Sequence, residues 1–128
     1  MTFLINQAIF ILINVLMAYK DASKIKEHKT IDHFLNGIAY LLTIIVFAMI
    51  FEMHWFEILL FTLSCFCNRQ LFFDIPLNLM RKLKWNYISE NPESFIDKIE
   101  RKITLIPGIM EVAYSGLWIF TIIMSLTL

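Results

Sequence analysis

The chain has 128 residues, of which 59% are apolar and 17% charged, with eleven basic and eleven acidic side chains and no formal net charge. A soluble domain typically has about 45–50% apolar residues, and a domain of this size has too little interior to bury the excess. The composition therefore excludes an ordinary soluble domain and predicts a single domain in the lipid bilayer. The balanced charge argues against a nucleic-acid-binding protein, whose surface is basic overall.

Four apolar stretches have the length that a helix needs to cross the hydrocarbon, about 17–25 residues. The first covers about residues 3–19, and positive charge follows it instead of preceding it, which is the wrong order for a secretory signal peptide. The others cover about 34–53, 55–75 and 104–126. We therefore predict an all-α integral membrane protein with four transmembrane helices.

Proline 76 follows the third stretch. Proline lacks an amide donor and disfavours helix at the residue before it, so we expect a kink or break near Ile75. The polar segment 77–103 comes next, and within it Asn91-Pro92-Glu93 has the residue order of a helix start. Apolar residues then recur at helical spacing. This pattern predicts a short amphipathic helix, either on the membrane surface or packed under the bundle.

The basic residues indicate an orientation. Ten of the eleven Lys and Arg lie in the connectors 20–33 and 77–103. Four spans put both connectors on one side, and short loops rich in Lys and Arg stay in the cytoplasm. We expect an inner-membrane protein with 77–103 in the cytoplasm and both chain termini, together with the turn at His54, outside.

Two charged residues lie away from the ends of the predicted spans and within the membrane, Arg69 in the third and Glu111 in the fourth. Insertion scales put the cost of an unpaired charge at the bilayer centre at about 2.5–3.5 kcal/mol. We predict that Arg69 pairs with Glu111, or with Asp74 if the helix breaks there. Such a pair either fixes the helix register or serves as an ion relay or a site for an anionic head group.

Further polar side chains gather near the cytoplasmic ends of the predicted spans. Carboxylates with an imidazole suit several divalent ions, but no ligand spacing supports a metal site, and we expect neither a metal nor a cofactor. Cys65 and Cys67 are two residues apart and do not face each other on a helix. The predicted inner-leaflet polar layer consists of Asp21, Asp32, His33, Asn36, Asn68 and Asn78.

Gln7 and Asn14 are seven residues apart in the first span and share one helix face. Polar side chains within a span tend to face other helices, where they can form hydrogen bonds. This spacing favours a contact between subunits, and hence a homo-oligomer. A contact within the protomer's own bundle is the alternative.

Standard catalytic motifs are absent from the sequence: there is no Gly-rich phosphate loop, nucleophile elbow or paired metal-ligand motif. The sequence therefore favours a non-enzymatic membrane protein that self-associates, either as a pore or as an assembly platform. Phage holins are a functional analogy because they are small and oligomeric, although external termini and a long cytoplasmic segment depart from them.

Two other functions stay open. One is an enzyme acting on a lipid head group at the cytoplasmic face, with Arg69 binding phosphate. Its acid, base or ligand would come from Asp21, His33, Asp74 or Glu111. The other is an accessory subunit that docks a protein partner through segment 84–102.

The stretches Tyr19-Lys20-Asp21-Ala22-Ser23-Lys24-Ile25-Lys26 and Ile31-Asp32-His33-Phe34-Leu35-Asn36-Gly37 resemble small multi-pass membrane proteins of Bacteroidetes-type bacteria and their phages. The resemblance covers a small part of the chain and implies no activity.

Overall fold

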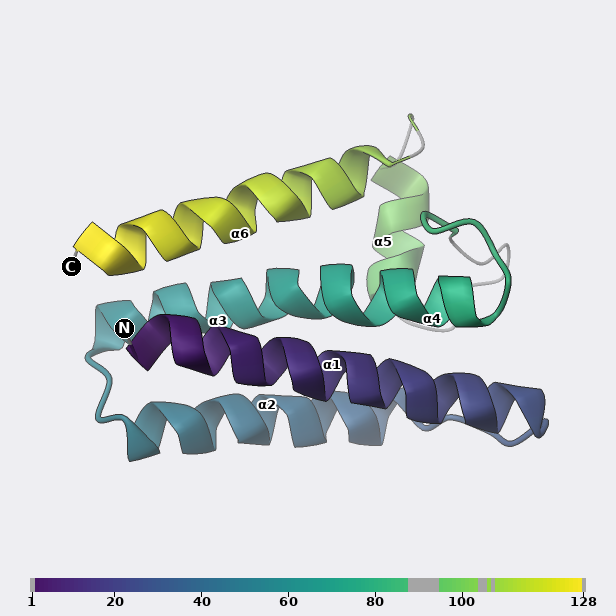
Figure 1. Ribbon diagram of the computed structural model, residues 1–128, viewed down its shortest axis with the longest axis horizontal. Helices are drawn as coiled ribbons and strands as arrows, with labels where there is room; N and C mark the ends of the chain where they lie inside the picture. The colour runs from purple at the N-terminus through teal and green to yellow at the C-terminus, as the bar shows by residue number, and fades with distance from the viewer. Residues whose placement is uncertain (1, 88–94, 104–105, 107, 128) are drawn as a thin grey trace.

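The computed structural model describes residues 2–87, 95–103, 106 and 108–127, except for the side chains of residues 96, 97 and 103. Every regular element in this part of the chain is helical (Figure 1). Four helices are long and apolar enough to cross a membrane, which confirms the predicted fold class. The elements are α1 (Thr2–Lys26), α2 (His33–Ile50), α3 (Trp55–Arg69), the π-helical turn η1 (Gln70–Asp74), α4 (Ile75–Met80), α5 (Phe95–Ile103) and α6 (Ile109–Thr127).

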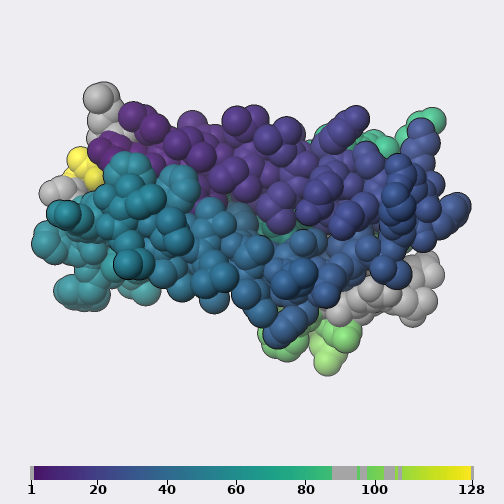
Figure 2. All heavy atoms as spheres, turned by 90° about the horizontal axis from the view of Figure 1, so that it is seen from below, coloured from purple at the N-terminus to yellow at the C-terminus, as the bar shows by residue number. Residues whose placement is uncertain are grey.

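The long helices run side by side, with α3 between α6 and α1 (Figure 1). Helices α1 and α2 lie next to each other along one face of the molecule (Figure 2). The starts of α1 and α3 and the ends of α2 and α6 meet at one end of the bundle. The connector between α1 and α2, the end of α4 and all of α5 lie at the opposite end. Both basic connectors therefore fall at the same end, as a four-span arrangement requires.

The third span does not break at Pro76. It continues from Trp55 to Met80, five residues past the predicted limit, and the turn just before the proline is π-helical. A proline ring clashes with the carbonyl of the preceding turn and removes a hydrogen bond, and a single π turn is a recognised way to insert such an irregularity into a helix. The expected disturbance near Ile75 is present, but it changes the helix type and does not end the span.

Other boundaries also differ from the prediction, and α2 ends at Ile50, three residues before its predicted limit. Helix α1 continues to Lys26 instead of ending near residue 19, with Lys24 and Lys26 in its last turn, where cations interact favourably with the helix dipole. Helix α6 begins at Ile109 instead of residue 104. Gly108, just before it, has a φ of +84°, a conformation that L side chains rarely adopt.

Local side-chain caps define where α2 and α3 begin. The carboxylate of Asp32 accepts a hydrogen bond from the amide of Leu35 at 2.9 Å and caps α2. At the start of α3, Glu57 accepts from the amide of His54 at 2.9 Å, and the His54 side chain completes a reciprocal capping box. These caps fix where α2 begins, after the connector from α1, and where α3 begins, after the turn that contains Glu52.

The amphipathic helix is present as α5 and packs on the bundle. The hydroxyl of Tyr114 on α6 donates to Oε1 of Glu100 at 2.6 Å, and Glu100 is buried. Phe95, at the start of α5, is 76% exposed. The helix is therefore anchored to α6 through a polar residue and leaves an aromatic side chain uncovered. The predicted helix start at Asn91-Pro92-Glu93 lies outside the described residues.

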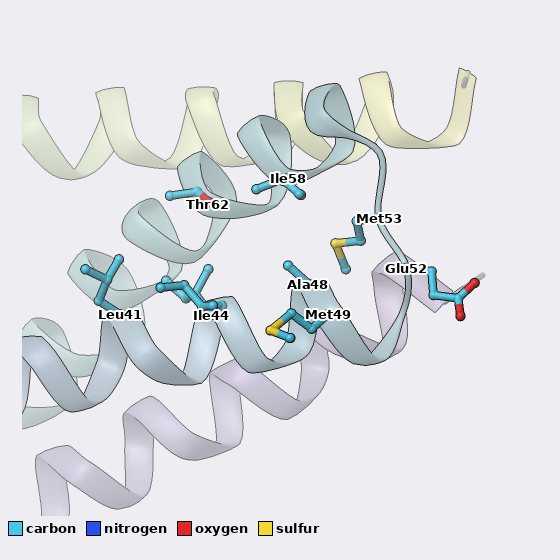
Figure 3. Close-up of a pocket in the computed structure, with 9 residues that line it drawn as sticks. Leu41, Ile44, Ala48, Met49, Glu52, Met53, Ile58 and Thr62 are labelled. Carbon is cyan, nitrogen blue, oxygen red and sulfur yellow. The ribbon is translucent and has the colours of Figure 1, made fainter.

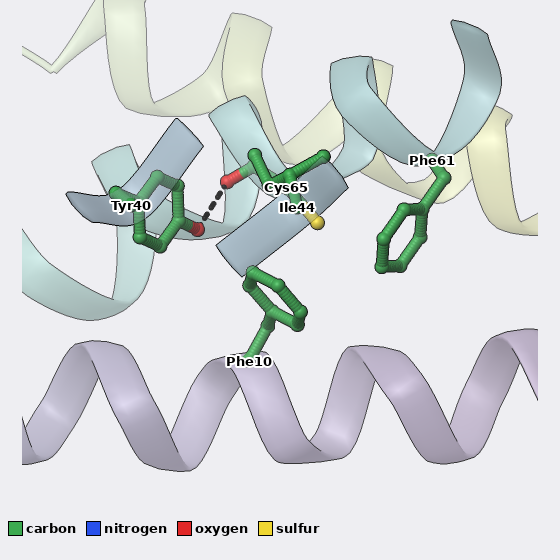
Figure 4. Packing of buried hydrophobic residues seen from close by; sticks show 5 residues of the cluster. All are labelled: Phe10, Tyr40, Ile44, Phe61 and Cys65. Carbon is green, nitrogen blue, oxygen red and sulfur yellow. Dashed lines mark hydrogen bonds between the residues drawn. The ribbon is translucent and has the colours of Figure 1, made fainter. Parts of the chain in front are cut away.

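The apolar core is aromatic. The ring of Phe10 on α1 is fully buried and makes edge-on contacts with the rings of Tyr40, Phe47 and Phe61 at centroid distances of 5.6, 5.1 and 5.5 Å. Such aromatic pairs are worth about 0.5–1.5 kcal/mol beyond their burial. Figure 4 shows Phe10, Tyr40 and Phe61 of this core together with Ile44 and Cys65, and the Tyr40 hydroxyl donates to the backbone carbonyl of Cys65.

Candidate functional site

One face of α1 carries a row of polar side chains that point into the bundle. Asn6, Gln7, Asn14 and Asp21 are each at most 2% exposed. The last three are spaced by seven residues and so share a face of the helix. Burying an amide in an apolar medium costs free energy unless it finds hydrogen-bond partners. The partners of this row therefore decide what it does.

Asn68 on α3 is the centre of the arrangement. Its Oδ1 accepts from Nδ2 of Asn14 at 2.9 Å. Its Nδ2 donates to the backbone oxygen and to Oε1 of Gln7, both at 3.2 Å. Asn68 is fully buried, so these bonds form away from water and lipid. A single amide thus bridges two turns of α1.

The network also reaches the other two spans. Nδ2 of Asn14 donates to the hydroxyl of Tyr40 on α2 at 3.1 Å, and that hydroxyl donates to the carbonyl of Cys65 at 2.9 Å (Figure 4). Nε1 of Trp118 on α6 donates to Oε1 of Gln7 at 3.0 Å. We call these residues the amide network: Gln7, Asn14, Tyr40, Asn68 and Trp118. It ties all four spans together inside the bundle.

Gln7 and Asn14 form hydrogen bonds within the protomer. They are buried in the single chain and bonded to α2, α3 and α6, and their contact with a second subunit stays a prediction. The sequence spacing correctly indicated that they face other helices. Tyr40, Asn68 and Trp118 satisfy only part of the hydrogen-bonding capacity of these two residues, because Nε2 of Gln7 and Oδ1 of Asn14 are buried without a partner within the described residues.

Arg69 lies beside the network and stacks on aromatic rings. Its guanidinium carbon is 5.1 Å from the centroid of the Tyr40 ring and 4.2 Å from that of Phe73. A cation over an aromatic face is stabilised by the ring quadrupole, more strongly where water is excluded. Nη1 of Arg69 is buried and has no hydrogen-bond partner within the described residues. The guanidinium thus retains an unused donor.

Among the residues that the structure describes, Arg69 and Glu111 do not form an ion pair. Because α6 begins at Ile109, Glu111 lies in its first turn, close to the end of the bundle, and it is partly exposed. Asp74 is the last residue of η1. The predicted pairing of Arg69 with one of these carboxylates stays a prediction, and the aromatic contacts are the ones that the structure gives this cation.

The predicted polar layer is divided among several places. Asp32 caps α2 with its carboxylate, and the amide of Asn36 donates to the Asp32 carbonyl at 3.0 Å. His33 is exposed in the first turn of α2. Nδ2 of Asn78 donates to the carbonyls of Trp85 and Tyr87 at 3.2 and 3.0 Å, which holds the connector after α4. Only Asn68 belongs to the amide network.

Asp21 is a buried carboxylate with an oxygen atom that is not hydrogen bonded within the described residues. It is 1% exposed, and the oxygen atom is Oδ1. Cys65 and Cys67 are buried free thiols. No group of three or more His, Cys, Asp or Glu side chains that could hold a metal occurs in the described ranges.

A groove runs between α2 and α3 (Figure 3). Its volume is about 330 Å³, and its walls are almost entirely apolar, including Leu41, Ile44 and Met49 of α2 and Ile58 and Thr62 of α3. Glu52 lies at the turn end of the groove.

Sequence reasoning identified Gln7, Asn14 and Asn68 but missed their partners Tyr40 and Trp118. Both are amphipathic side chains well inside apolar spans, and a buried Tyr or Trp usually finds a partner for its polar atom. That rule would have nominated both. It could not have said which amide each one meets.

Comparison of the chain with protein-family models, with characterised proteins and with solved structures finds no match.

Proposed function

We propose that this multi-pass membrane protein is non-catalytic and works by assembly, with a second copy packing on the outer face of α6. That face consists of Val112, Gly116, Ile119 and Ile123, which share one side of the helix at spacings of four, three and four residues. We call it the α6 face. The other side of α6 carries Trp118 and the buried Thr121.

The α6 face is uncovered near the middle of a spanning helix. Val112, Ile119 and Ile123 are 70%, 53% and 54% exposed. Thr121 is the only buried residue that α6 contributes within the described chain. The amide network and the aromatic core use the inner faces of the helices, so this face is left for lipid or for another helix.

Gly116 is the observation that carries the proposal. Exposed apolar side chains alone do not drive helices together in lipid, because lipid tails are equally apolar; close packing at small residues does. Gly116 is exposed in the middle of the α6 face, and a Cβ added there meets no atom within 4 Å. A second helix can therefore approach the backbone closely at this point.

Subunit counting in liposomes tests the proposal, with a matched control in the same chain. Gly37 on α2 is also exposed and also has open space around an added Cβ. We expect several photobleaching steps for the unmodified protein and for Gly37→Ile, and mostly single steps for Gly116→Ile. Single steps for the unmodified protein, or equal effects of the two substitutions, would contradict assembly through the α6 face.

Dye release from the same liposomes separates a pore from a platform. Phe10 and the amide network fill the interior between the spans, so a pore would form between copies and not through one chain. Protein-dependent release that disappears in Gly116→Ile supports a pore. Tight vesicles that contain assembled protein support a platform.

We also propose that the end of the bundle with the basic connectors faces the cytoplasm of the inner membrane. Short cytoplasmic loops carry an excess of Lys and Arg, and both basic blocks lie at one end. Thiol labelling of intact cells tests this in a cysteine-free background. A membrane-impermeant reagent should modify Thr127→Cys and spare Lys84→Cys, and the reverse pattern would invert the orientation.

A second candidate function is binding of an anionic lipid head group, which the unused Nη1 of Arg69 favours. An arginine forms strong, charge-assisted hydrogen bonds with phosphate oxygens. Retention of phosphatidylglycerol by the unmodified protein, and its loss in Arg69→Gln, would support this function and would be the first step toward the lipid-enzyme alternative. Equal retention would exclude Arg69 as the anchor.

The accessory-subunit alternative depends on segment 84–102. In the described parts of this segment, Lys84, Lys98 and Arg101 are exposed, so an acidic partner surface is the complement that it would recognise. Co-purification that depends on these cations and weakens with salt would favour docking.

A further inference from the structure

A second cavity lies at the end of the bundle opposite the basic connectors. Its volume is about 270 Å³. It forms where α1 and α3 begin, α2 ends and α6 ends, so it opens at the depth of lipid head groups and not at the bilayer centre. It is lined by Thr2, Phe3, Asn6, Phe51, Met53, Glu57, Leu60 and Ser125.

Asn6 is the unexplained residue of this cavity. Its side chain is fully buried, and neither Nδ2 nor Oδ1 has a hydrogen-bond partner within the described residues. A buried polar group left without a partner costs about 1–3 kcal/mol. In the neighbouring Gln7, Oε1 accepts hydrogen bonds within the amide network and only Nε2 has no partner, whereas both polar atoms of Asn6 have none within the described residues. An occupant of the cavity that both donates and accepts would satisfy it.

Besides the hydroxyl of Thr2, which can donate or accept, the other polar groups of the cavity are the acceptors of Glu57 and Ser125. Oε2 of Glu57 is used by the amide of His54, and its Oε1 takes no hydrogen bond from the described chain. The hydroxyl of Ser125 donates to the carbonyl of Ile122 at 2.7 Å, which leaves its lone pairs to accept. The cavity therefore presents more acceptors than donors, and one of the acceptors is a carboxylate.

The charge at this end of the molecule favours a cation. The cavity is built from three stretches of the chain, 1–19, 30–68 and 103–128, none of which contains Lys or Arg. Glu52, in the same turn, adds a second carboxylate. No lysine or arginine is thus placed to neutralise Glu57 from these stretches, and a positively charged occupant gains from both acidic groups.

We propose that this cavity binds a primary ammonium group, and that its source is the head group of an ethanolamine-type phospholipid. The three N–H donors of the ammonium match Oε1 of Glu57, Oδ1 of Asn6 and Oγ of Ser125. A phosphate or ester oxygen of the same lipid accepts from Nδ2 of Asn6. Phe3 and Leu60 provide apolar wall for the aliphatic part. This site is independent of the α6 face and of Arg69.

Native mass spectrometry of the full-length protein from mixed micelles tests the assignment. The two probes are phosphatidylethanolamine and phosphatidylcholine with identical acyl chains, because the trimethylammonium of the second keeps the charge but has no N–H donor. We expect the unmodified protein to retain the ethanolamine lipid about tenfold better. Glu57→Gln keeps an acceptor for the His54 amide, and Asn6→Leu removes an unpaired amide, so both should fold and both should lose the selectivity.

Glu52→Gln is the matched control, since it removes one negative charge at the same end but lines the other groove. It should keep the selectivity. Equal loss in Glu52→Gln and Glu57→Gln would overturn the site in favour of a general surface-charge effect. Equal retention of the two lipids by the unmodified protein would overturn the lipid assignment.

Free ethanolamine in the millimolar range separates the two sources of the ammonium group. If it stabilises the unmodified protein against thermal unfolding but not Glu57→Gln, while the lipids are retained equally, the site takes a soluble primary amine and not a lipid. If neither the lipid ratio nor ethanolamine depends on Glu57 and Asn6, the cavity holds water alone and the proposal is wrong.

Discussion

The side chains of Asn14 and Asn68 are hydrogen bonded to each other at 2.9 Å, although 54 residues separate them in the chain. The bond joins the first and third spans in the interior of the bundle, where both side chains are fully buried. Through Tyr40 and Gln7 it extends to α2 and α6. The relative positions of all four spans thus depend on one buried set of polar atoms.

Replacing Asn68 by Leu should destabilise the bundle. The substitution removes three hydrogen bonds and leaves Nδ2 of Asn14 with only Tyr40, and Oε1 of Gln7 with only Trp118, as a partner. Membrane hydrogen bonds average about 0.6 kcal/mol each in double-mutant cycles. Thermal unfolding in detergent should show a clear drop in melting temperature.

Ser64→Ala is the control for that measurement. Ser64 is fully buried on the same helix, but its hydroxyl has no hydrogen-bond partner within the described residues. Its removal should leave the melting temperature unchanged or slightly raised. A loss as large as that of Asn68→Leu would mean that burial of any polar group on α3, and not the network, sets the stability.

Gly108→Ala should be strained in two ways. The residue has a φ of +84°, and an added Cβ would lie 3.0 Å from Cη2 of Trp85. The left-handed conformation alone costs a non-glycine residue about 1–2 kcal/mol. Gly37→Ala has open space and a helical backbone, so it should be neutral or stabilising. Equal melting temperatures for the two variants would argue against the described turn before α6.

Tyr114→Phe should loosen α5 from α6. The substitution removes the 2.6 Å hydrogen bond to Glu100 and keeps the ring that packs against Phe66 at 5.9 Å. Hydrogen–deuterium exchange of residues 95–103 should become faster while α1 and α3 stay protected. If exchange in α5 is unchanged, its attachment does not depend on this bond.

Arg69→Lys should cost stability even though it preserves the charge. Lysine has no planar guanidinium to stack on Tyr40 and Phe73, and cation–π contacts are worth about 0.5–2 kcal/mol. Arg81 is exposed beyond the third span, so Arg81→Lys supplies a control with the same chemical change. Equal melting temperatures for Arg69→Lys and Arg81→Lys would contradict a stabilising role for the stacking of Arg69.

The spans could be predicted from sequence because each is a long apolar run, and the runs survive as helices even where their limits move. The limits moved for local reasons. Lys20 to Lys26 can continue a helix past the apolar stretch, a π turn absorbs Pro76, and a left-handed Gly108 delays α6. The wrong start of the fourth span is also what made Glu111 seem to lie deep in the membrane beside Arg69.

Only some of the residues that form the amide network could be predicted from the sequence. Periodicity showed that Gln7 and Asn14 share a face, but it could not say whether that face meets another chain or another span. That depends on the rotation of α3, which brings Asn68 between them, and on how α2 and α6 pack. Likewise, Coulomb reasoning sought a carboxylate for Arg69 and did not foresee the two aromatic rings that the fold places beside it.

The most direct test of the account is to cross-link positions 14 and 68 in membranes, in a background without Cys65 and Cys67. If the amide network lies within one chain, Asn14→Cys/Asn68→Cys treated with a short thiol cross-linker should run as a compacted monomer, and Asn14→Cys alone should give no dimer. A cross-linked dimer of Asn14→Cys alone would place this residue at a subunit contact and contradict the intramolecular network.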